Sequence, residues 1–363
     1  MSEFIKGVMI HMTSQPCSPI DAVITWVDGA DPAHQAKRHA RLKQARRALH
    51  ANGINPHRWG SSDELTYCLT SLANHAPWIR HIWLVTDNQA PDMSVIPLGI
   101  RDRLRIIDHR IVFDGLHHVL PTFNSLSIET VIWRIPGLSD SFLYFNDDVF
   151  LTAPLRPEDV FCNDKPVLRG KWVDHSALAQ DAAKLRDPAL FNHFTQINAA
   201  RLAGFDAAHM WASAHVVHPL RRPVLEDLFA RLPAEFMANL AHPFRDVTQF
   251  QPMALHNHVA INRGKYVTAP AKDYLHLRSG AALELPLEQV RAWLQHSCSG
   301  DAKFLCVNDF PQLEACMPES RALIARAVGA QAGSTPPTGP QATAPERAPS
   351  ASAPDHLFQI GAS

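Results

Sequence analysis

The sequence predicts an α/β fold: a Rossmann-like, mainly parallel sheet with helices on both faces, followed by a helical second half. Short apolar runs rich in β-branched residues are typical of buried strands. Segments with helical periodicity separate these runs, which favours parallel pairing. Each run also stops at a polar cluster. The predicted strands are Ile20–Val27, His81–Thr86, Leu104–Ile107 and Phe142–Phe145.

Turn and cap residues separate these elements. The first strand stops at the turn Asp28–Pro32, and a basic helix is predicted over Ala33–His50. Ser61 and Glu64 have the spacing of a capping box, which predicts a helix with Glu64 at its third position that ends at Ala76–Pro77. A further helix is predicted from Pro121–Ser125 to Arg134, others within Ala214–Leu232 and over Phe244–His256 and Leu287–His296, and a strand at Phe304–Val307.

Composition limits the function classes. The 363 residues carry 34 Lys and Arg against 35 Asp and Glu, so the chain has no overall attraction to nucleic acid. No apolar run reaches the ~18 residues that cross a bilayer, and we expect no secretory signal. Six scattered cysteines without C-x-x-C pairs predict reduced thiols in a cytoplasmic protein. P-loop, dinucleotide-binding glycine and nucleophile-elbow motifs are absent, which disfavours P-loop ATPases, Rossmann dehydrogenases and α/β-hydrolases.

The chain divides into segments of different composition. Ala, Gly, Ser, Thr and Pro dominate its last part, which therefore cannot bury enough apolar surface to fold. The predicted segments are a loose N-terminus at 1–19, a single domain at 20–312 with an α/β core at 20–160 and a helical part at 161–312, a terminal helix at 313–328 and a disordered tail at 329–363.

Two acidic clusters follow predicted strands. Asp147 and Asp148 suit a divalent cation such as Mg²⁺ or Mn²⁺, with a polar turn as the simpler interpretation. Asp28 and Asp31 suit a base, a metal or a ribose, although Asp31 also fits an N-cap before Pro32. Because ligands of open α/β sheets bind outside the carboxyl ends of the strands, we expect both clusters to line one site.

Two further residue types suggest chemistry. His215 and His218 are three positions apart, a spacing compatible with zinc, but they lack the glutamate of a zinc-protease helix. His215 is alternatively a general base or a phosphate contact. Arg245 suits bidentate pairing with phosphate, and a structural pair with Asp246 is the other interpretation.

Four sequence blocks, in order, resemble the signature regions of the Stealth proteins. This family includes bacterial capsular polysaccharide phosphotransferases and the animal N-acetylglucosamine-1-phosphotransferase. A match in several blocks is more specific than any single motif. The blocks are Ile20–Pro32, Glu64–Leu151, His215–Leu228 with its continuation to Phe244–Arg245, and Lys303–Asp309.

The resemblance implies a GT-A-type catalytic domain with an acceptor-side helical part. It implies transfer of a hexose or N-acetylhexosamine 1-phosphate from a UDP-sugar to a hydroxyl of an acceptor glycan, with release of UMP, in capsule or exopolysaccharide synthesis. Arg245 is expected to stabilise the phosphoryl oxygens, and His215 or Asp28 to take the acceptor proton. The implied ligands of Mg²⁺ (or Mn²⁺) are Asp147, Asp148, Asn308 and Asp309. The implied substrate-binding residues are Trp26, Asp31, Thr86, Asp87, Asn88, Gln89, Asn124, Ser125, Asn146 and His218.

Two alternatives stay open at this point. One is a metal-dependent glycosyltransferase that releases UDP, and the other is a non-catalytic sugar-binding or capsule-assembly protein. The expected partners are the UDP-sugar donor and a polysaccharide or oligosaccharide acceptor, with no nucleic acid. We expect a cytoplasmic location, with the capsule-export machinery at the inner membrane as a candidate contact.

Overall fold

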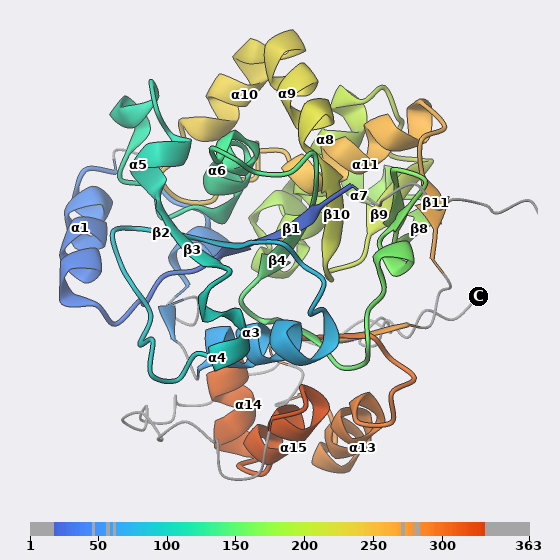
Figure 1. Ribbon diagram of the computed structural model, residues 1–363. Coiled ribbons are helices and arrows are strands. Elements are labelled where there is room, and N and C mark those ends of the chain that lie inside the picture. Colours follow the sequence, from blue (N-terminus) through green and yellow to red (C-terminus); the bar gives the residue numbers. More distant parts are fainter. Residues whose placement is uncertain are drawn as a thin grey trace, which may run out of the picture.

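The computed structural model describes residues 18–330, apart from 46–47, 56–58, 61–62, 270–272, 279 and 281–283. The predicted loose N-terminus and disordered tail therefore lie almost wholly outside the described residues. The predicted α/β fold with a mainly parallel sheet is confirmed (Figure 1). None of the helices in the described part has both the length and the apolar character needed to cross a membrane.

A five-stranded sheet, in the order β10-β4-β1-β2-β3, forms the centre of the fold. Four of its strands are parallel, and the edge strand β10 runs antiparallel to β4. The strands β1, β2 and β4 are mostly apolar and buried, as expected for strands covered on both faces, and Asp21 is a buried carboxylate within β1. The strands are β1 (Ile20–Thr25), β2 (Ile82–Thr86), β3 (Leu104–Asp108), β4 (Ser141–Asn146) and β10 (His218–Arg221).

The period-2 alternation of β1 divides its side chains between two hydrophobic cores. Ala22 and Ile24 belong to the core on one face, and Val23 belongs to the core on the other. Figure 1 shows the two helix layers above and below the sheet. The first layer contains α3 (Glu64–His75), α13 (Leu287–Ser297), α14 (Phe310–Cys316) and α15 (Ser320–Ala327), and the second contains α5 (His109–Val112), α6 (Ser125–Glu129), α9 (Arg222–Arg231) and α10 (Pro233–Leu240).

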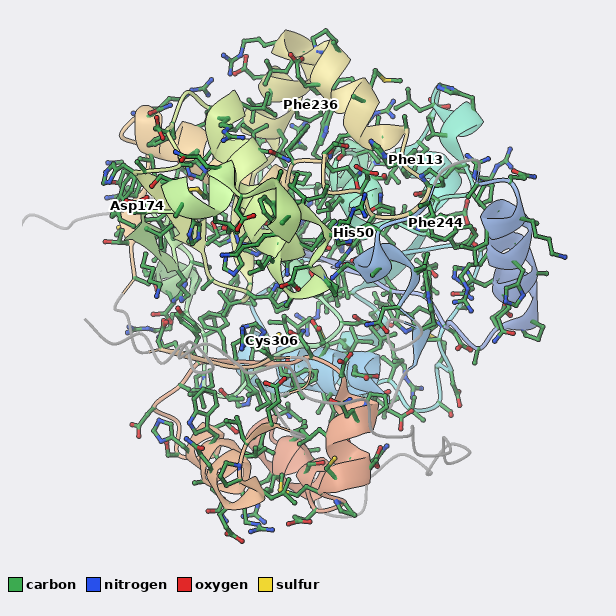
Figure 2. All side chains as sticks on the ribbon, turned by 180° about the vertical axis from the view of Figure 1, so that it is seen from behind. His50, Phe113, Asp174, Phe236, Phe244 and Cys306 are labelled. Carbon is green, nitrogen blue, oxygen red and sulfur yellow. The ribbon has the colours of Figure 1, made fainter. Side chains whose placement is uncertain are left out.

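In the second half, the helices expected within Ala214–Leu232 and at Leu287–His296 and the strand expected at Phe304–Val307 are present. The helix predicted over Phe244–His256 is wrong in its first part, because 244–251 form turns and the helix begins only at Pro252. Several short strands were not predicted. Figure 2, seen from behind, shows Phe236 on the side of α9 and α10, and Cys306 toward the C-terminal helices. Additional helices are α7 (Ser176–Gln180), α8 (Phe191–Leu202) and α11 (Pro252–Asn262). The strands outside the central sheet are β5 (Val149–Leu151), β6 (Phe161–Cys162), β7 (Lys165–Leu168), β8 (Gly170–Val173), β9 (Met210–Ser213), β11 (Val267–Thr268), β12 (Tyr274–Leu277) and β13 (Phe304–Val307).

Several predicted boundaries differ from the structure. The basic helix α1 (Pro32–Lys43) ends well before the predicted end at His50. Two short helices lie further along the chain: α2 (Ala51–Ile54), and α4 (Leu98–Arg101) after β2. The capping box is wrong, because Asp63 adopts a left-handed conformation (φ 66°) and α3 begins at Glu64 itself. The predicted terminal helix is divided into α14 and α15, since Pro318 lies between them and cannot donate a helical hydrogen bond.

Candidate active site

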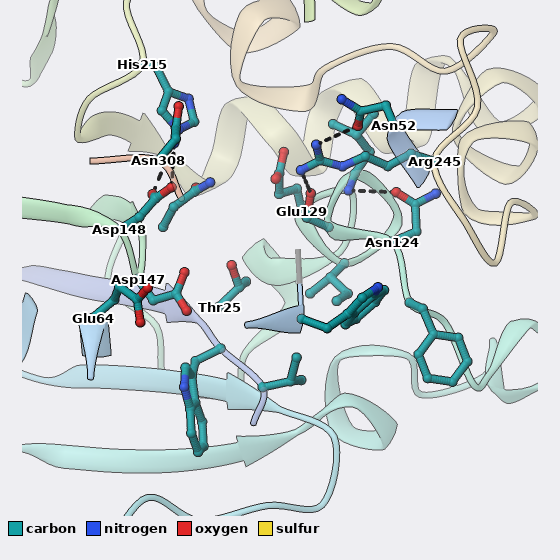
Figure 3. A pocket seen from close by; sticks show the side chains of 18 of the residues that line it. Thr25, Asn52, Glu64, Asn124, Glu129, Asp147, Asp148, His215, Arg245 and Asn308 are labelled. Carbon is teal, nitrogen blue, oxygen red and sulfur yellow. Dashed lines mark hydrogen bonds and ion pairs between the residues drawn. The ribbon is translucent and has the colours of Figure 1, made fainter. Parts of the chain in front are cut away.

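A cavity of about 320 Å³ opens at the carboxyl edge of the central sheet. The chain turns away from the sheet there after each parallel strand, so residues distant in sequence meet at this edge. In Figure 3, Asp148, Asn308 and His215 lie on one side of the cavity and Arg245 lies on the other. The lining residues that the sequence predicted are Trp26, Asn124, Ser125, Asn146, Asp147, Asp148, His215, His218, Arg245, Asn308 and Asp309.

Asp148 is positioned by two neighbouring strands. It precedes β5, and its backbone oxygen accepts a hydrogen bond from the amide of Val307 at the end of β13 (3.0 Å). Asn308 Nδ2 donates to Asp148 Oδ2 at 2.6 Å. The other end of this amide, Oδ1, accepts a hydrogen bond from His276 Nε2 at 2.8 Å. The side chain of Asn308 therefore holds Asp148 in place. That Asn308 itself binds a metal stays a prediction.

The donor atoms in the cavity suit a hard divalent cation. Ligand atoms of Asp148, His215 and Cys306 lie within 4.8 Å of one another. Burial and the nearby Asp148 and Asp147 raise the pKa of the Cys306 thiol well above its usual value, so it is a protonated thiol and not a thiolate. The carboxylates of Glu64, Asp147 and Asp148 line the same cavity, and carboxylate oxygens are preferred ligands of Mg²⁺ and Mn²⁺. The residues present therefore fit the predicted kind of cation.

His215 faces this carboxylate group. Its Nε2 lies 3.9 Å from Asp148 Oδ1. Burial, with a contribution from the charge of Arg245, lowers the pKa of His215 to about 4. Burial also lowers the pKa of His218 to about 3 and that of His276 to about 4, with smaller contributions from neighbouring imidazoles. All three imidazoles are neutral near pH 7, so His215 is able to accept a proton there.

Arg245 presents a fixed guanidinium group on the opposite wall. Its Nη2 donates to Ser125 Oγ at 2.7 Å, and its Nη1 donates to Asn52 Oδ1 at 3.2 Å. Its Nε is buried and has no hydrogen-bond partner within the described part of the chain. Asp246, the structural alternative, instead accepts hydrogen bonds from Thr248. The charges of Glu129 and Asp148 act on this guanidinium, but its hydrogen-bond partners are neutral and it keeps an unused donor, so it is suited to bind an anion.

The side chains of several predicted residues are used in local hydrogen bonds. The Asn124 side chain caps α6 by accepting from the amide of Leu126, and its Nδ2 donates to His242 O and Gln249 Oε1. Asp31 caps α1, as the structural interpretation predicted. Asp28 does not line the cavity, and its Oδ1 accepts a hydrogen bond from the amide of Ala30 at 2.8 Å.

The group that follows β2 also lies outside this cavity. The Gln89 amide is tied to the backbone of Asp28, and Thr86 is fully buried. Asp87 and Asn88 line a second cavity of about 520 Å³ beside the first. The roles predicted for these residues in substrate binding stay predictions.

Sequence reasoning missed two carboxylates of the site. Glu64 had been placed in a capping box, but it begins α3 and points into the cavity. Glu129 accepts a hydrogen bond from Tyr144 at 3.2 Å, and Tyr144 shares another with Thr25 at 2.9 Å. A glutamate between the apolar neighbours Ile128 and Val131 in a predicted helix is a signal that could have identified Glu129.

The fold and site define an α/β protein with a carboxylate-rich cleft that faces a buried arginine. Conserved regions 1, 2 and 3 of the Stealth proteins match residues 18–46, 58–168 and 214–262. A capsular polysaccharide phosphotransferase of Aeromonas hydrophila is 31% identical over 309 residues, which are 80% of this chain and 79% of that protein. The chain therefore belongs to the Stealth family. The fourth resembling block, Lys303–Asp309, stays a prediction.

Other relatives are matched over a smaller share of their length. An exopolysaccharide phosphotransferase of Streptomyces coelicolor is 33% identical over 294 residues, 80% of this chain and 47% of that protein. The chain thus spans about half of this relative, and 26% and 49% of two others from the same organism. Among solved structures, the galactosyltransferase LgtC with donor and acceptor sugar analogues aligns at a TM-score of 0.44 and 11% identity, covering 85% of this chain and 95% of LgtC. Mouse xyloside xylosyltransferase 1 aligns at a TM-score of 0.39 and 12% identity, covering 80% and 98%.

Proposed function

We propose that this protein transfers a hexose or N-acetylhexosamine 1-phosphate from a UDP-sugar to a hydroxyl of an acceptor glycan, in capsule or exopolysaccharide synthesis. The observation that carries the proposal is the meeting of Asp147, Asp148, His215 and Arg245, from separate Stealth regions, in one cavity. The relatives are named as capsular and exopolysaccharide phosphotransferases, which supports the same reaction class. We place the reaction in the cytoplasm, with the capsule-export machinery as a candidate contact.

The reaction is a displacement at the sugar-bearing phosphorus. The acceptor oxygen attacks this phosphorus, the bond to the oxygen that bridges the two phosphates breaks, and UMP leaves with that electron pair. His215 Nε2 takes the proton of the acceptor hydroxyl, because the imidazole is neutral near pH 7. The products are a phosphodiester between the two sugars and UMP.

The charges of the site match this displacement. Negative charge is spread over the oxygens of the phosphoryl group in the transition state, and catalysis consists mainly of positioning and charge stabilisation. Arg245 is held by Ser125 and Asn52, so its guanidinium needs no rearrangement when the charge develops. Asp147 and Asp148 would hold Mg²⁺ or Mn²⁺, which neutralises diphosphate charge when it is bound.

The nucleotide product tests the proposal. The protein is incubated with UDP-GlcNAc, an oligosaccharide acceptor and Mg²⁺, with and without EDTA, and the nucleotide is identified by chromatography. UMP that requires both acceptor and metal supports sugar-1-phosphate transfer. UDP would instead assign glycosyl transfer by attack at the sugar carbon. No nucleotide release with any member of a panel of nucleotide sugars would favour a sugar-binding or capsule-assembly protein.

A further inference from the structure

A second group of polar side chains, none of them a carboxylate, lies on the wall of the same cavity. His34 and His109 are 2% and 3% exposed, and Thr122 is buried beside them on the same cavity. Each has a buried polar atom, His34 Nε2, His109 Nε2 and Thr122 Oγ1, that makes no hydrogen bond to any residue that the structure describes. Buried polar atoms are nearly always paired, so three such atoms on one cavity wall point to a ligand.

The partners of His34 decide which ring nitrogen faces the carboxylate. His34 Nδ1 lies 3.0 Å from Asp87 Oδ2, and Lys37 Nζ contacts both oxygens of the same carboxylate at 2.9 and 3.0 Å. The pKa of Asp87 is lowered to about 2: burial opposes ionisation, but the hydrogen bonds from His34 and Lys37 outweigh it. A carboxylate only accepts hydrogen bonds, so Nδ1 carries the proton. With the proton on Nδ1, the neutral form of the imidazole presents Nε2 as an acceptor.

The position of Asp87, the partner of His34, places this group at a different strand end from Asp147. Asp87 follows β2 and Asp147 follows β4, with β1 between the two strands. At about 4.8 Å between neighbouring strands, the two strand ends are roughly 10 Å apart. His34 is hydrogen-bonded to Asp87 and so is held at the β2 end of the sheet edge, whereas Asp147 follows β4. It is placed to contact the distant, nucleoside end of a donor whose diphosphate lies near Asp147.

The surroundings of His34 suit a planar heterocycle. Its ring centroid lies 5.2 Å from that of Phe123 and 5.8 Å from that of Trp59. The guanidinium of Arg38 also lies over the Trp59 ring, 4.2 Å from the ring centroid. Phe123 is in turn stacked on Phe244, with centroids 5.5 Å apart. Aromatic walls with a few fixed polar atoms are typical of sites that bind a flat, hydrogen-bonding ligand.

We propose that His34, oriented by Asp87, accepts a hydrogen bond from the imide N–H of uracil and so selects the base of the nucleotide donor. This inference rests on the proposed function, since it concerns the donor of that reaction. Thr122 and His109 lie on the same wall and are the candidate donors to the uracil carbonyl oxygens. Cytosine has no ring N–H at this position and would leave His34 Nε2 unpaired, which is unfavourable in a buried site.

Nucleotide binding, measured by titration calorimetry without acceptor, tests this inference separately from turnover. The ligands are UDP, CDP, GDP and N3-methyl-UDP, each with Mg²⁺. We expect the protein to bind UDP about 10- to 100-fold more tightly than CDP and N3-methyl-UDP, which corresponds to one hydrogen bond to a buried group. His34→Phe removes the acceptor and should weaken UDP binding by the same factor, while N3-methyl-UDP binding stays unchanged.

Two further variants control for folding and for orientation. His81→Phe changes a half-buried histidine at the opposite end of β2 and should leave all affinities unchanged. Asp87→Asn keeps the size of the side chain, but an amide can donate as well as accept and so no longer fixes which ring nitrogen of His34 carries the proton. It should therefore reduce the preference for UDP over N3-methyl-UDP. Thermal unfolding confirms that each variant is folded at the temperature of the titration.

The outcomes separate this inference from the proposed function. Equal affinity of the unmodified protein for UDP, CDP and N3-methyl-UDP, or tighter binding of GDP, would overturn the role of His34. If His34→Phe weakened the binding of every nucleotide equally, the role of His34 would also be overturned. If UMP is released from UDP-GlcNAc in either case, the proposed function stands without this inference. If the protein neither binds UDP nor releases UMP, both fail.

Discussion

Asn308 donates a hydrogen bond to Asp148 across 160 positions of sequence, with 2.6 Å between Nδ2 and Oδ2. The pairing depends on β13, which lies antiparallel to β5 and so brings the residue after one strand beside the residue before the other. Because Asn308 also accepts a hydrogen bond from His276, its amide has a single orientation. Asp148 is therefore fixed before any ligand binds.

This relationship predicts the effect of Asn308→Ala. A hydrogen bond to a charged group is worth about 1.5–3 kcal/mol, so loss of the positioning of Asp148 should reduce kcat roughly 10- to 100-fold. The measurement is UMP release at saturating UDP-GlcNAc. The matched control is Asn262→Ala, because Asn262 Nδ2 donates to Ala203 O at the surface. This variant should keep full activity. Unchanged turnover in Asn308→Ala would show that Asp148 needs no such support.

Arg245→Lys tests the fork geometry of the guanidinium. Lysine keeps the charge but cannot bond Ser125 and Asn52 while it also contacts a phosphate. We expect kcat/KM to fall by about 100-fold or more, with most of the loss in kcat. Arg263→Lys alters an exposed ion pair with Asp227 and should change kcat/KM by less than about twofold. Equal rates for both variants would remove Arg245 from the chemistry.

The pH profile tests His215 as the base. Burial and Arg245 lower the pKa of His215 to about 4, so its neutral form is present throughout the neutral range. We expect kcat to be level between pH 6 and 8 and to decline as the pH falls toward about 4. His215→Asn should be nearly inactive at every pH. A decline centred near pH 6.5 would indicate that the base is an imidazole with an ordinary pKa, and not the buried His215.

Metal removal distinguishes Asp148 from Cys306. We expect EDTA to abolish UMP release and added Mg²⁺ or Mn²⁺ to restore it, because carboxylate oxygens suit these ions. Cys306→Ser should retain activity and the same metal preference, since the buried thiol is protonated. Asp148→Asn should raise the Mg²⁺ concentration that gives half-maximal activity. Loss of metal dependence in Cys306→Ser would instead place the sulfur among the ligands.

Asp21 is predicted to stabilise the fold without taking part in the site. It is fully buried, and its carboxylate accepts hydrogen bonds from Arg80, Trp83 and the Ser139 amide. Asp21→Ala leaves these donors unpaired and should lower the free energy of unfolding by about 3–5 kcal/mol, measured with urea. The folded fraction should keep its kcat. Asp227→Ala, which breaks surface ion pairs, should cost about 1 kcal/mol or less.

The first half of the fold could be predicted because its signals are local. In β2 and β4 the apolar runs are continuous and in β1 only Asp21 interrupts the run, and each strand ends in a polar residue, such as Asn146. The edge strand β10 was missed, since it is only four residues long and contains Pro219. Its antiparallel pairing with β4 depends on the tertiary structure, and no periodicity within the segment reveals it.

The candidate site shows the same division. Asp147, Asp148, His215 and Arg245 could be named from the sequence, because polar residues beside strands and the block resemblance mark them. Their partners could not be named in the same way. Glu64 had a local explanation as a cap, and the environment of His34 is formed by Asp87, Trp59 and Phe123, which are distant in sequence.

The sequence by itself determined the α/β class, the parallel strands and the residues that stand at their ends, since apolar periodicity and turn chemistry act over a few positions. The tertiary structure alone decided which of these residues meet. Asp28 and Asp31 are held by local hydrogen bonds outside the cavity, whereas the β5–β13 pairing places Asn308 on Asp148 and sheet order separates Asp87, the partner of His34, from Asp147. Contacts between distant segments depend on how the layers pack, and packing is a property of the whole chain.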